Sequence, residues 1–171
     1  MIKSDPAYTK HPRRLQDVIT AVQVLGNFQT ATATTEKWQN RIGTPPVSAT
    51  SWEKVFKDHP EFFRTYEHEE ESGAQGIRIT YSLVLRRSQQ RIWLRTERRL
   101  ANSQEITDFG SDLSKLTWPP VSVDQVTSLV DIAIKLHSAE WTHKEKSRWW
   151  LAIVTALAGF VGALLGALLK Q

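Results

Sequence analysis

The chain has 171 residues, a formal net charge of +4 and no cysteine. This length is typical of one domain with appendages and is too short for most multi-domain enzymes. The lack of cysteine excludes disulfide bonds, thiolate metal sites and cysteine nucleophiles. Residues 1–100 carry 16 Lys and Arg against 11 Asp and Glu, so the positive excess belongs to the N-terminal part.

Three short helices are predicted in the first 60 residues. Apolar side chains spaced by three and four indicate the first over about 12–25. A threonine-rich stretch offers an N-cap for the second, which ends before Gly43, and Ser51 can cap the third, which ends near 59–60.

Two strands are predicted next, over 62–66 and 77–85, joined by the polar turn 67–76. Three helices followed by a hairpin is the element order of a winged-helix domain. In that arrangement 52–58 takes the position of the recognition helix, and the glutamate-rich turn lies at the tip of the wing.

A long amphipathic helix is predicted after a stretch of weak periodicity over 86–120. Ser122 and Gln125 resemble a capping box, and no proline or glycine interrupts the chain from 121 to 158. One continuous helix of about 45 residues and roughly 70 Å is therefore expected. The predicted fold is α+β: a winged-helix-like domain over 1–87, a basic linker over 88–121, an amphipathic juxtamembrane helix over 122–148 and a transmembrane helix over 149–169.

One face of the 122–148 helix needs a partner. That partner is either the N-terminal domain of the same chain or other copies in a coiled coil, and the sequence leaves both open. The apolar residues on this face are Val126, Leu129, Val130, Ala133 and Leu136.

The segment 149–169 contains 21 consecutive residues without a charge. As a helix it would be roughly 31 Å long, which is the thickness of a bilayer core. Basic residues before it and the positive-inside rule predict a single-pass, tail-anchored protein of the inner (cytoplasmic) membrane with its N-terminal domain in the cytoplasm. The expected membrane-interface residues are Lys144, Lys146, Arg148, Trp149 and Trp150.

Small residues recur by three and four along the same segment. Such a stripe lets helices approach closely in lipid, so we expect a homo-oligomer. The expected oligomerisation residues are Ala158, Gly159, Gly162, Ala163, Gly166 and Ala167.

Six arginines fall within 14 residues and form the predicted basic patch. The patch could bind phosphates of nucleic acid or anionic lipid headgroups, or it could be a solvated face or linker. Its members are Arg86, Arg87, Arg91, Arg95, Arg98 and Arg99.

The predicted recognition helix is electrically neutral and the wing tip is acidic, so a protein partner is favoured over specific reading of DNA. The cluster 68–71 is interpreted as a solvated acidic loop and not as a cation site. No catalytic motif occurs in the sequence, and we expect neither enzymatic activity nor a cofactor or metal.

Two stretches carry a resemblance to a known group. They are RLQDVITAVQVLGNF through WEKVFKDHPEFFR with RITYSLVLRR, and IKLHSAEWTHKEKSRWWLAIVTALAGFVGALLGALL. Together they resemble small bacterial proteins in which a winged-helix-like domain precedes a Ser-Arg-Trp-Trp juxtamembrane motif and a C-terminal membrane helix. The resemblance implies architecture and bacterial origin, and it implies no particular activity.

The first functional hypothesis is a membrane-anchored interaction or sensor module that self-associates through its transmembrane helix and binds a cytoplasmic protein. Two alternatives remain open. One is an oligomeric effector that disrupts the membrane, for example in anti-phage defence, and the other is a membrane-tethered nucleic-acid binder that uses the arginines.

Overall fold

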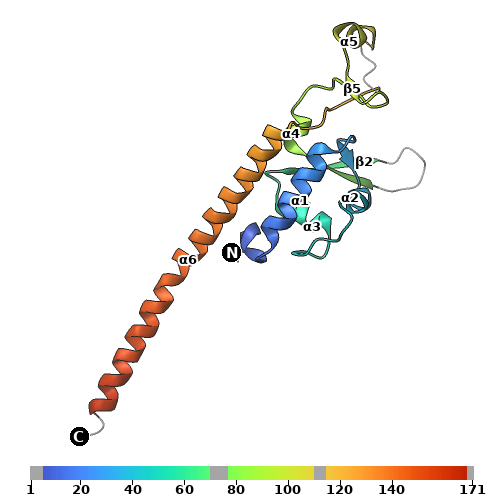
Figure 1. The fold of residues 1–171 in the computed structure, drawn as a ribbon. Coiled ribbons are helices and arrows are strands. Elements are labelled where there is room, and N and C mark those ends of the chain that lie inside the picture. Colours follow the sequence, from blue (N-terminus) through green and yellow to red (C-terminus); the bar gives the residue numbers. More distant parts are fainter. Residues whose placement is uncertain (1–5, 70–76, 110–114, 169–171) are drawn as a thin grey trace.

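The computed structural model describes residues 6–69, 77–109 and 115–168, and the side chains of 69, 147–153 and 156–168 lie outside the description. A long helix, α6, runs past the other elements, which gather beside its N-terminal half (Figure 1). In chain order the elements are η1 (Ala7–Lys10), α1 (Arg14–Asn27), β1 (Thr32–Ala33), α2 (Thr35–Ile42), α3 (Trp52–Asp58), β2 (Phe63–Glu69), β3 (Ile77–Leu83), α4 (Val84–Arg87), β4 (Trp93–Leu94), β5 (Arg99–Leu100), α5 (Ser103–Phe109), β6 (Leu116–Thr117) and α6 (Val123–Leu168).

The three helices predicted near the N-terminus form as α1, α2 and α3, and local signals set their ends. At the start of α3 the Ser51 hydroxyl accepts a hydrogen bond from the Lys54 N–H at 3.3 Å. Gly43 ends α2 in the left-handed conformation, with φ at 83°. From there its N–H donates to the Gln39 carbonyl at 2.8 Å, as is typical of a C-terminal cap.

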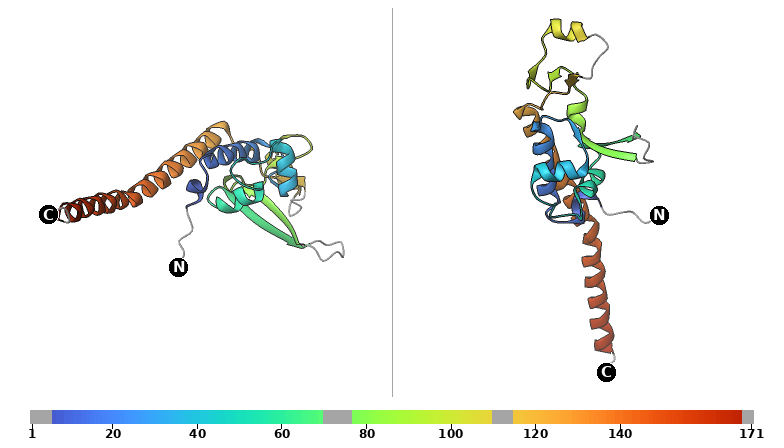
Figure 2. Two further views of the ribbon diagram at one scale, coloured as in Figure 1. Left: turned by 90° about the horizontal axis from the view of Figure 1, so that it is seen from below. Right: turned by 90° about the vertical axis from the view of Figure 1, so that its right-hand side faces the viewer.

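The predicted hairpin forms as β2 and β3, which pair antiparallel from Phe63 opposite Leu83 to Glu69 opposite Ile77. β1 adds on the other side of β3, so the order is β1-β3-β2 and β2 is an edge strand. The hairpin projects away from the helices (Figure 2). Side chains alternate along a strand, and Phe63, Tyr81 and Leu83 enter the core from one face. The opposite face carries the residues of the site described below.

The hydrophobic core joins these helices and the sheet to the start of α6. Val126 and Ala133 are buried in it, together with Val121 just before the helix. Gly26 lies in the last turn of α1, where α6 approaches closely: a Cβ on Gly26 would lie 3.2 Å from Val126 Cγ2. The long helix thus finds its partner, over these residues, in its own chain, while Leu136 is 37% exposed.

A second sheet occupies the region predicted as a basic linker. Its strand order is β5-β4-β6, and Leu94 and Leu116 are buried within it. Helix α5 follows β5 and buries none of its residues. The sheet and α5 lie beyond the N-terminal end of α6 (Figures 1 and 2). Strands of two residues are too short for an alternating pattern, so the sequence contains no signal for them.

The predicted architecture, a winged-helix-like domain followed by a transmembrane helix, is wrong, although the class is α+β. The three helices and the hairpin do not close a core by themselves, because Val121, Val126 and Ala133 complete it. A third strand, β1, and the second sheet add to the predicted elements.

Over the residues that the structure describes, no helix has both the length and the apolar character needed to cross a membrane. The prediction of a single-pass, tail-anchored membrane protein is therefore wrong. Helix α6 runs without a break, but its described side chains include charged residues such as Asp131 and Lys135. The uncharged run 149–169 lies, apart from two residues, outside the described side chains. The predicted inner-membrane location and the membrane-disrupting alternative both depended on a transmembrane helix over 149–169. The location stays a prediction.

Candidate anion-binding face

Arg86 is fully buried and is not part of an exposed basic patch. Its guanidinium group donates to five backbone carbonyls, with four of the distances between 3.0 and 3.3 Å; they belong to Leu25, Phe28, Gln29, Thr30 and Trp118. Burial, and to a smaller extent the charge of Arg41, lowers the pKa of Arg86 to about 10, so the side chain stays protonated at neutral pH. Arg86 therefore joins the end of α1 to the segment that precedes α6.

Three other arginines of the predicted patch, Arg95, Arg98 and Arg99, lie in β5 and in the turn that joins β4 to it. Arg99 forms ion pairs with Glu97 and Glu105, each at 2.5 Å. The hydrogen bond from Arg99, with one from the backbone of Asn102, lowers the pKa of Glu105 to about 2. The charge of Arg99 is thus offset locally, whereas Arg95 and Arg98 are exposed.

Arg87 and Arg91 stack on aromatic rings. The guanidinium carbon of Arg87 lies 3.6 Å from the centroid of the Trp118 ring and 4.5 Å from that of Tyr66. The Arg87 Nε also donates to the Tyr66 hydroxyl at 3.2 Å. The guanidinium carbon of Arg91 lies 4.0 Å from the same Trp118 centroid. Such contacts are favourable and orient a guanidinium plane, while the N–H groups at its edge can still bind a ligand.

The outer face of the hairpin extends this cluster. Residues opposite one another in antiparallel strands share a face, and side chains alternate along each strand. The register pairs Tyr66 with Thr80 and His68 with Arg78, so Arg64, Tyr66 and Arg78 lie on one face. We call the combined surface the arginine–aromatic face; it consists of Arg64, Tyr66, Arg78, Arg87, Arg91 and Trp118.

No described carboxylate pairs with the cations of the arginine–aromatic face. Its four arginines are absent from the ion pairs formed among the residues that the structure describes. Glu67 of β2 falls on the opposite face of the hairpin, because it alternates with Tyr66 and His68. Four positive charges on one face produce a local potential that attracts polyanions.

Helix α3, in the predicted recognition position, presents no comparable charge. Lys57 pairs with Glu53 one turn earlier, at 2.6 Å. Asp58 pairs with Lys10 at 2.7 Å and with Arg14 at 3.3 Å. Burial by itself would raise the pKa of Asp58, but the hydrogen bond from Lys10 and the nearby positive charges lower it overall. Lys10 and Arg14 are therefore engaged in contacts that hold η1 and α1 against α3.

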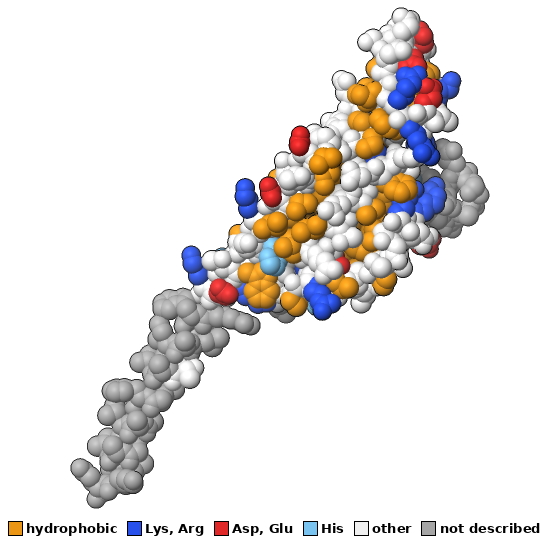
Figure 3. Space-filling view, viewed as in Figure 1, with side chains coloured by type: hydrophobic (Ala, Val, Ile, Leu, Met, Phe, Trp, Pro, Cys, Tyr) orange, Lys and Arg blue, Asp and Glu red, His pale blue; other side chains and the backbone are white. Residues whose placement is uncertain are grey.

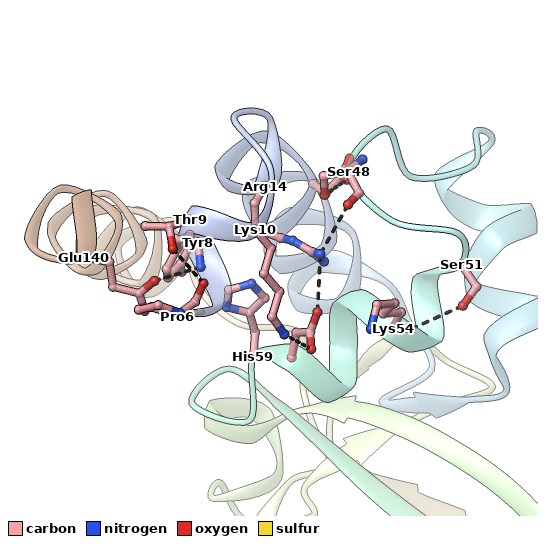
Figure 4. Close-up of polar contacts among 12 residues, drawn as sticks. Pro6, Tyr8, Thr9, Lys10, Arg14, Ser48, Ser51, Lys54, His59 and Glu140 are labelled. Atoms are coloured by element: carbon pink, nitrogen blue, oxygen red, sulfur yellow. Dashed lines mark hydrogen bonds and ion pairs between the residues drawn. The ribbon is translucent and has the colours of Figure 1, made fainter. Parts of the chain in front are cut away.

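An aromatic and histidine cluster, which the sequence analysis missed, packs η1 against α3 and α6. The ring centroid of Tyr8 lies 4.4 Å from that of His59 and 5.7 Å from that of His137. The Tyr8 N–H donates to Glu140 Oε2 at 2.8 Å, and His59, fully buried, lies beside Tyr8 (Figure 4). Tyr8 and Glu140 are 132 positions apart, so no local spacing could have indicated the contact.

The predicted membrane-interface and oligomerisation residues are described only in part. Lys144 Nζ donates to the Thr9 carbonyl at 3.1 Å, which packs α6 on η1, and Lys146 is exposed. Outside the described side chains lie Arg148, Trp149, Trp150, Ala158, Gly159, Gly162, Ala163, Gly166 and Ala167.

The cluster 68–71, predicted to be a solvated acidic loop, lies mostly outside the described residues. No group of three or more metal-ligating side chains occurs among the residues that are described. His68 Nε2 is hydrogen-bonded to the Thr80 hydroxyl at 3.1 Å. Residues 70–76 lie outside the description.

Comparison of the chain with protein-family models, curated proteins and solved structures found no match. The winged-helix assignment therefore gains no support from relatives, and the resemblance to small bacterial membrane proteins stays a prediction.

Proposed function

We propose that the chain is a non-enzymatic binding module whose arginine–aromatic face binds the phosphate backbone of nucleic acid. One observation carries the proposal: four arginines with no ion pair among the described residues share a face with Tyr66 and Trp118. A guanidinium group can donate two parallel hydrogen bonds to one phosphate. A row of such groups suits a polymer of phosphates better than a single small anion.

Stacking prepares Arg87 and Arg91 for this role. Both guanidinium groups are already held against the Trp118 ring, so less side-chain freedom is lost when a phosphate binds. Guanidinium planes and aromatic rings are also surfaces on which unpaired bases stack. The face thus combines charge for the backbone with flat groups for bases.

The position of the charge supports backbone contacts over base reading in a duplex. A major-groove reader presents base-reading side chains from a helix, whereas Lys10, Arg14 and Lys57, on and around α3, are already paired. The expectation of a protein partner depended on the electrical neutrality of α3. The arginines lie instead on the hairpin, on α4 and in the loops that follow, so the neutrality of α3 does not argue against binding of nucleic acid there.

Fluorescence anisotropy of the full chain with a labelled oligothymidine of about 20 nucleotides tests the proposal. In the double variant Arg87→Gln/Arg91→Gln we expect affinity to fall about tenfold or more. The slope of log K against log salt should decrease by about 1 to 2, because up to two phosphate contacts are lost.

The control variant Arg95→Gln/Arg98→Gln removes the same charge from exposed residues of the second sheet. It should weaken binding no more than about twofold, since only long-range attraction changes. Equal losses in both variants would overturn the assignment to the arginine–aromatic face. Binding of anionic lipid vesicles without binding of the oligonucleotide would overturn the choice of nucleic acid.

Self-association along α6 is a second candidate. Ile132 and Leu136 are one turn apart and 46% and 37% exposed. Figure 3 shows apolar side chains in rows on this side of the molecule. A second copy of the helix would cover them, as in a coiled coil.

Light scattering of the purified chain tests this second candidate. We expect an oligomer that Ile132→Lys/Leu136→Lys dissociates, because the two lysines would place like charges in the shared interface. Ser138→Lys/Thr142→Lys, on exposed positions of the same helix, should leave it intact. A wild-type monomer would contradict self-association.

A further inference from the structure

The outer edge of β2 carries backbone groups that β3 does not use. The Val84 N–H donates to the Phe62 carbonyl at 2.8 Å, so the even-numbered residues of β2 are the ones that bond to β3. The Phe63 N–H points the other way, to a carbonyl of the preceding turn at 3.0 Å. Because bonded residues alternate in an antiparallel pair, the N–H and C=O groups of Thr65 and Glu67 also face outward. No strand covers this edge in the described sheet, where β2 is the last strand.

A pocket of about 410 Å³ borders the start of this edge. Phe56 and Lys57 of α3 and Phe63 and Thr65 of β2 contribute to its lining. The rings of Phe56 and Phe63 pack with their centroids 5.0 Å apart and are buried in the core. Strand alternation places Phe63 and Thr65 on the face of the hairpin opposite to Tyr66. A residue placed opposite Phe63 on an added strand shares this face, so its side chain reaches the pocket.

Charges on the two faces of β2 select the strand with which the edge can pair. Arg64 and Glu67 form no ion pair among the described residues. They lie on opposite faces, because side chains alternate along a strand. Among the described side chains of β2, the face of Arg64 carries no carboxylate and the face of Glu67 carries no cation. A partner strand is therefore favoured when it presents an acidic residue to Arg64 and a basic residue to Glu67.

A second copy of β2 does not meet this requirement. Opposite residues in an antiparallel pair share a face, so a copy added through the same edge brings no carboxylate to Arg64 and no cation to Glu67. Charged side chains on an edge strand discourage pairing between copies in this way. The edge is therefore suited to a chain of different sequence.

We infer that β2 binds an extended peptide of another protein, which adds to the sheet as an antiparallel strand. Antiparallel pairing is the more stable arrangement per residue. From its N-terminus, the peptide has a basic residue opposite Glu67, an acidic residue opposite Arg64 and an apolar residue opposite Phe63. Main-chain hydrogen bonds supply affinity, and the three side chains supply specificity. The inference goes beyond the proposed function and does not depend on it, since the two surfaces share only Arg64.

NMR titration of the isotope-labelled full chain tests the inference with synthetic peptides that contain the core Arg-Val-Val-Glu-Leu. The core pairs in turn with Glu67, Tyr66, Thr65, Arg64 and Phe63. Wild type should bind it at least about fivefold more tightly than the core Glu-Val-Val-Arg-Leu, which has the same composition but places like charges opposite one another. Alanine in place of the leucine should weaken binding about tenfold, because the apolar contact in the pocket is lost.

N-methylation of the peptide tests main-chain pairing without any change in the protein. The second valine lies opposite Thr65 at a hydrogen-bonded position, so a methyl group on its nitrogen should weaken binding about tenfold or more. The first valine lies opposite Tyr66, and its N–H points away from β2. Methylation there is the matched control and should change affinity by no more than about threefold. In the wild-type complex the amide protons of Thr65 and Glu67 should shift and exchange more slowly with water.

A charge reversal in the protein supports the peptide comparisons. Arg64→Glu should weaken binding of Arg-Val-Val-Glu-Leu at least about fivefold, because it places two carboxylates opposite one another. Arg95→Glu makes the same change of charge at an exposed position of the second sheet and should weaken binding no more than about twofold. The peptide comparisons use wild type, so a misfolded Arg64→Glu protein does not affect them.

Three outcomes would overturn the inference: equal affinity for the two charge arrangements, equal effects of the two N-methyl groups, or no binding of any peptide. Shifts of the Thr65 and Glu67 amides that depend on protein concentration in the absence of peptide would assign the edge to a second copy and would also overturn it. Binding of oligothymidine is measured on its own. Failure of the peptides therefore leaves the proposed function standing, and failure of oligothymidine leaves the peptide result standing.

Discussion

The two sheets of the molecule use arginine in opposite ways. Beside the first sheet, β1-β3-β2, Arg86 is buried and its guanidinium group donates hydrogen bonds to five backbone carbonyl oxygens. In the second sheet, β5-β4-β6, Arg99 forms ion pairs with Glu97 and Glu105 at the surface. The buried group is costly to disturb, whereas exposed pairs contribute little to stability. Arg87 differs from both. In the described structure it stacks on aromatic rings and pairs with no carboxylate.

Removing Arg86 should have the largest effect. The substitution Arg86→Met leaves five buried or partly buried carbonyl groups without their donor, and we expect the free energy of unfolding to fall on the order of 4 kcal/mol. Urea denaturation followed by circular dichroism measures the loss. Arg91→Met, at an exposed position, should change it by less than about 1 kcal/mol. Similar losses in the two variants would contradict the different roles assigned to these arginines.

Wedging α1 and α6 apart should have the next largest effect. In Gly26→Leu the new side chain meets Val126, Val121 and Leu83, whose atoms would lie 3.2 to 3.7 Å from a Cβ. Overpacking at such a site costs about 1–3 kcal/mol, which a shift in the thermal midpoint should reveal. Gln23→Leu, exposed on the same helix, is the matched control and should be close to neutral. An unaffected Gly26→Leu protein would show that α6 does not complete the core.

Neutralising Asp58 should have a smaller, pH-dependent effect. Because the folded state lowers the pKa of this carboxyl group, its contribution is present above the unfolded pKa of about 3.9 and disappears as pH falls through the folded pKa. We therefore expect Asp58→Asn to be less stable than wild type by about 1–2 kcal/mol at pH 7. The difference should vanish in strong acid. Asp131→Asn, exposed on α6, is the matched control and should leave the stability at pH 7 unchanged.

The smallest effect on stability is expected in the second sheet. Arg99→Gln should leave the urea midpoint unchanged, since the ion pairs are exposed and screened by solvent. The pKa of Glu105 should nevertheless rise from about 2 toward the usual value of about 4.3, as measured by NMR titration. A pKa that stays near 2 would mean that Arg99 is not its cause.

Local signals account for the elements that were predicted correctly. The Ser51 cap, the glycine at 43 and the alternation over β3 act within a few residues, so α1, α2, α3 and the hairpin could be read from the chain. The second sheet could not, because its strands have two residues each and β6 pairs with β4 from a distant part of the chain. The transmembrane prediction rested on the apolar run and on the basic and aromatic residues that precede it, and the described helices do not support it.

The sequence by itself determined that arginines cluster between 86 and 99 and that aromatic residues lie nearby in the chain. Only the tertiary structure decided what each arginine does. Arg86 turns inward because carbonyls from the end of α1, 56 to 61 positions away, surround its guanidinium group. Arg87 turns outward because Tyr66 and Trp118, from separate elements, supply the rings on which it stacks. The environment that desolvates or exposes a charge comes from distant segments, and no local pattern encodes it.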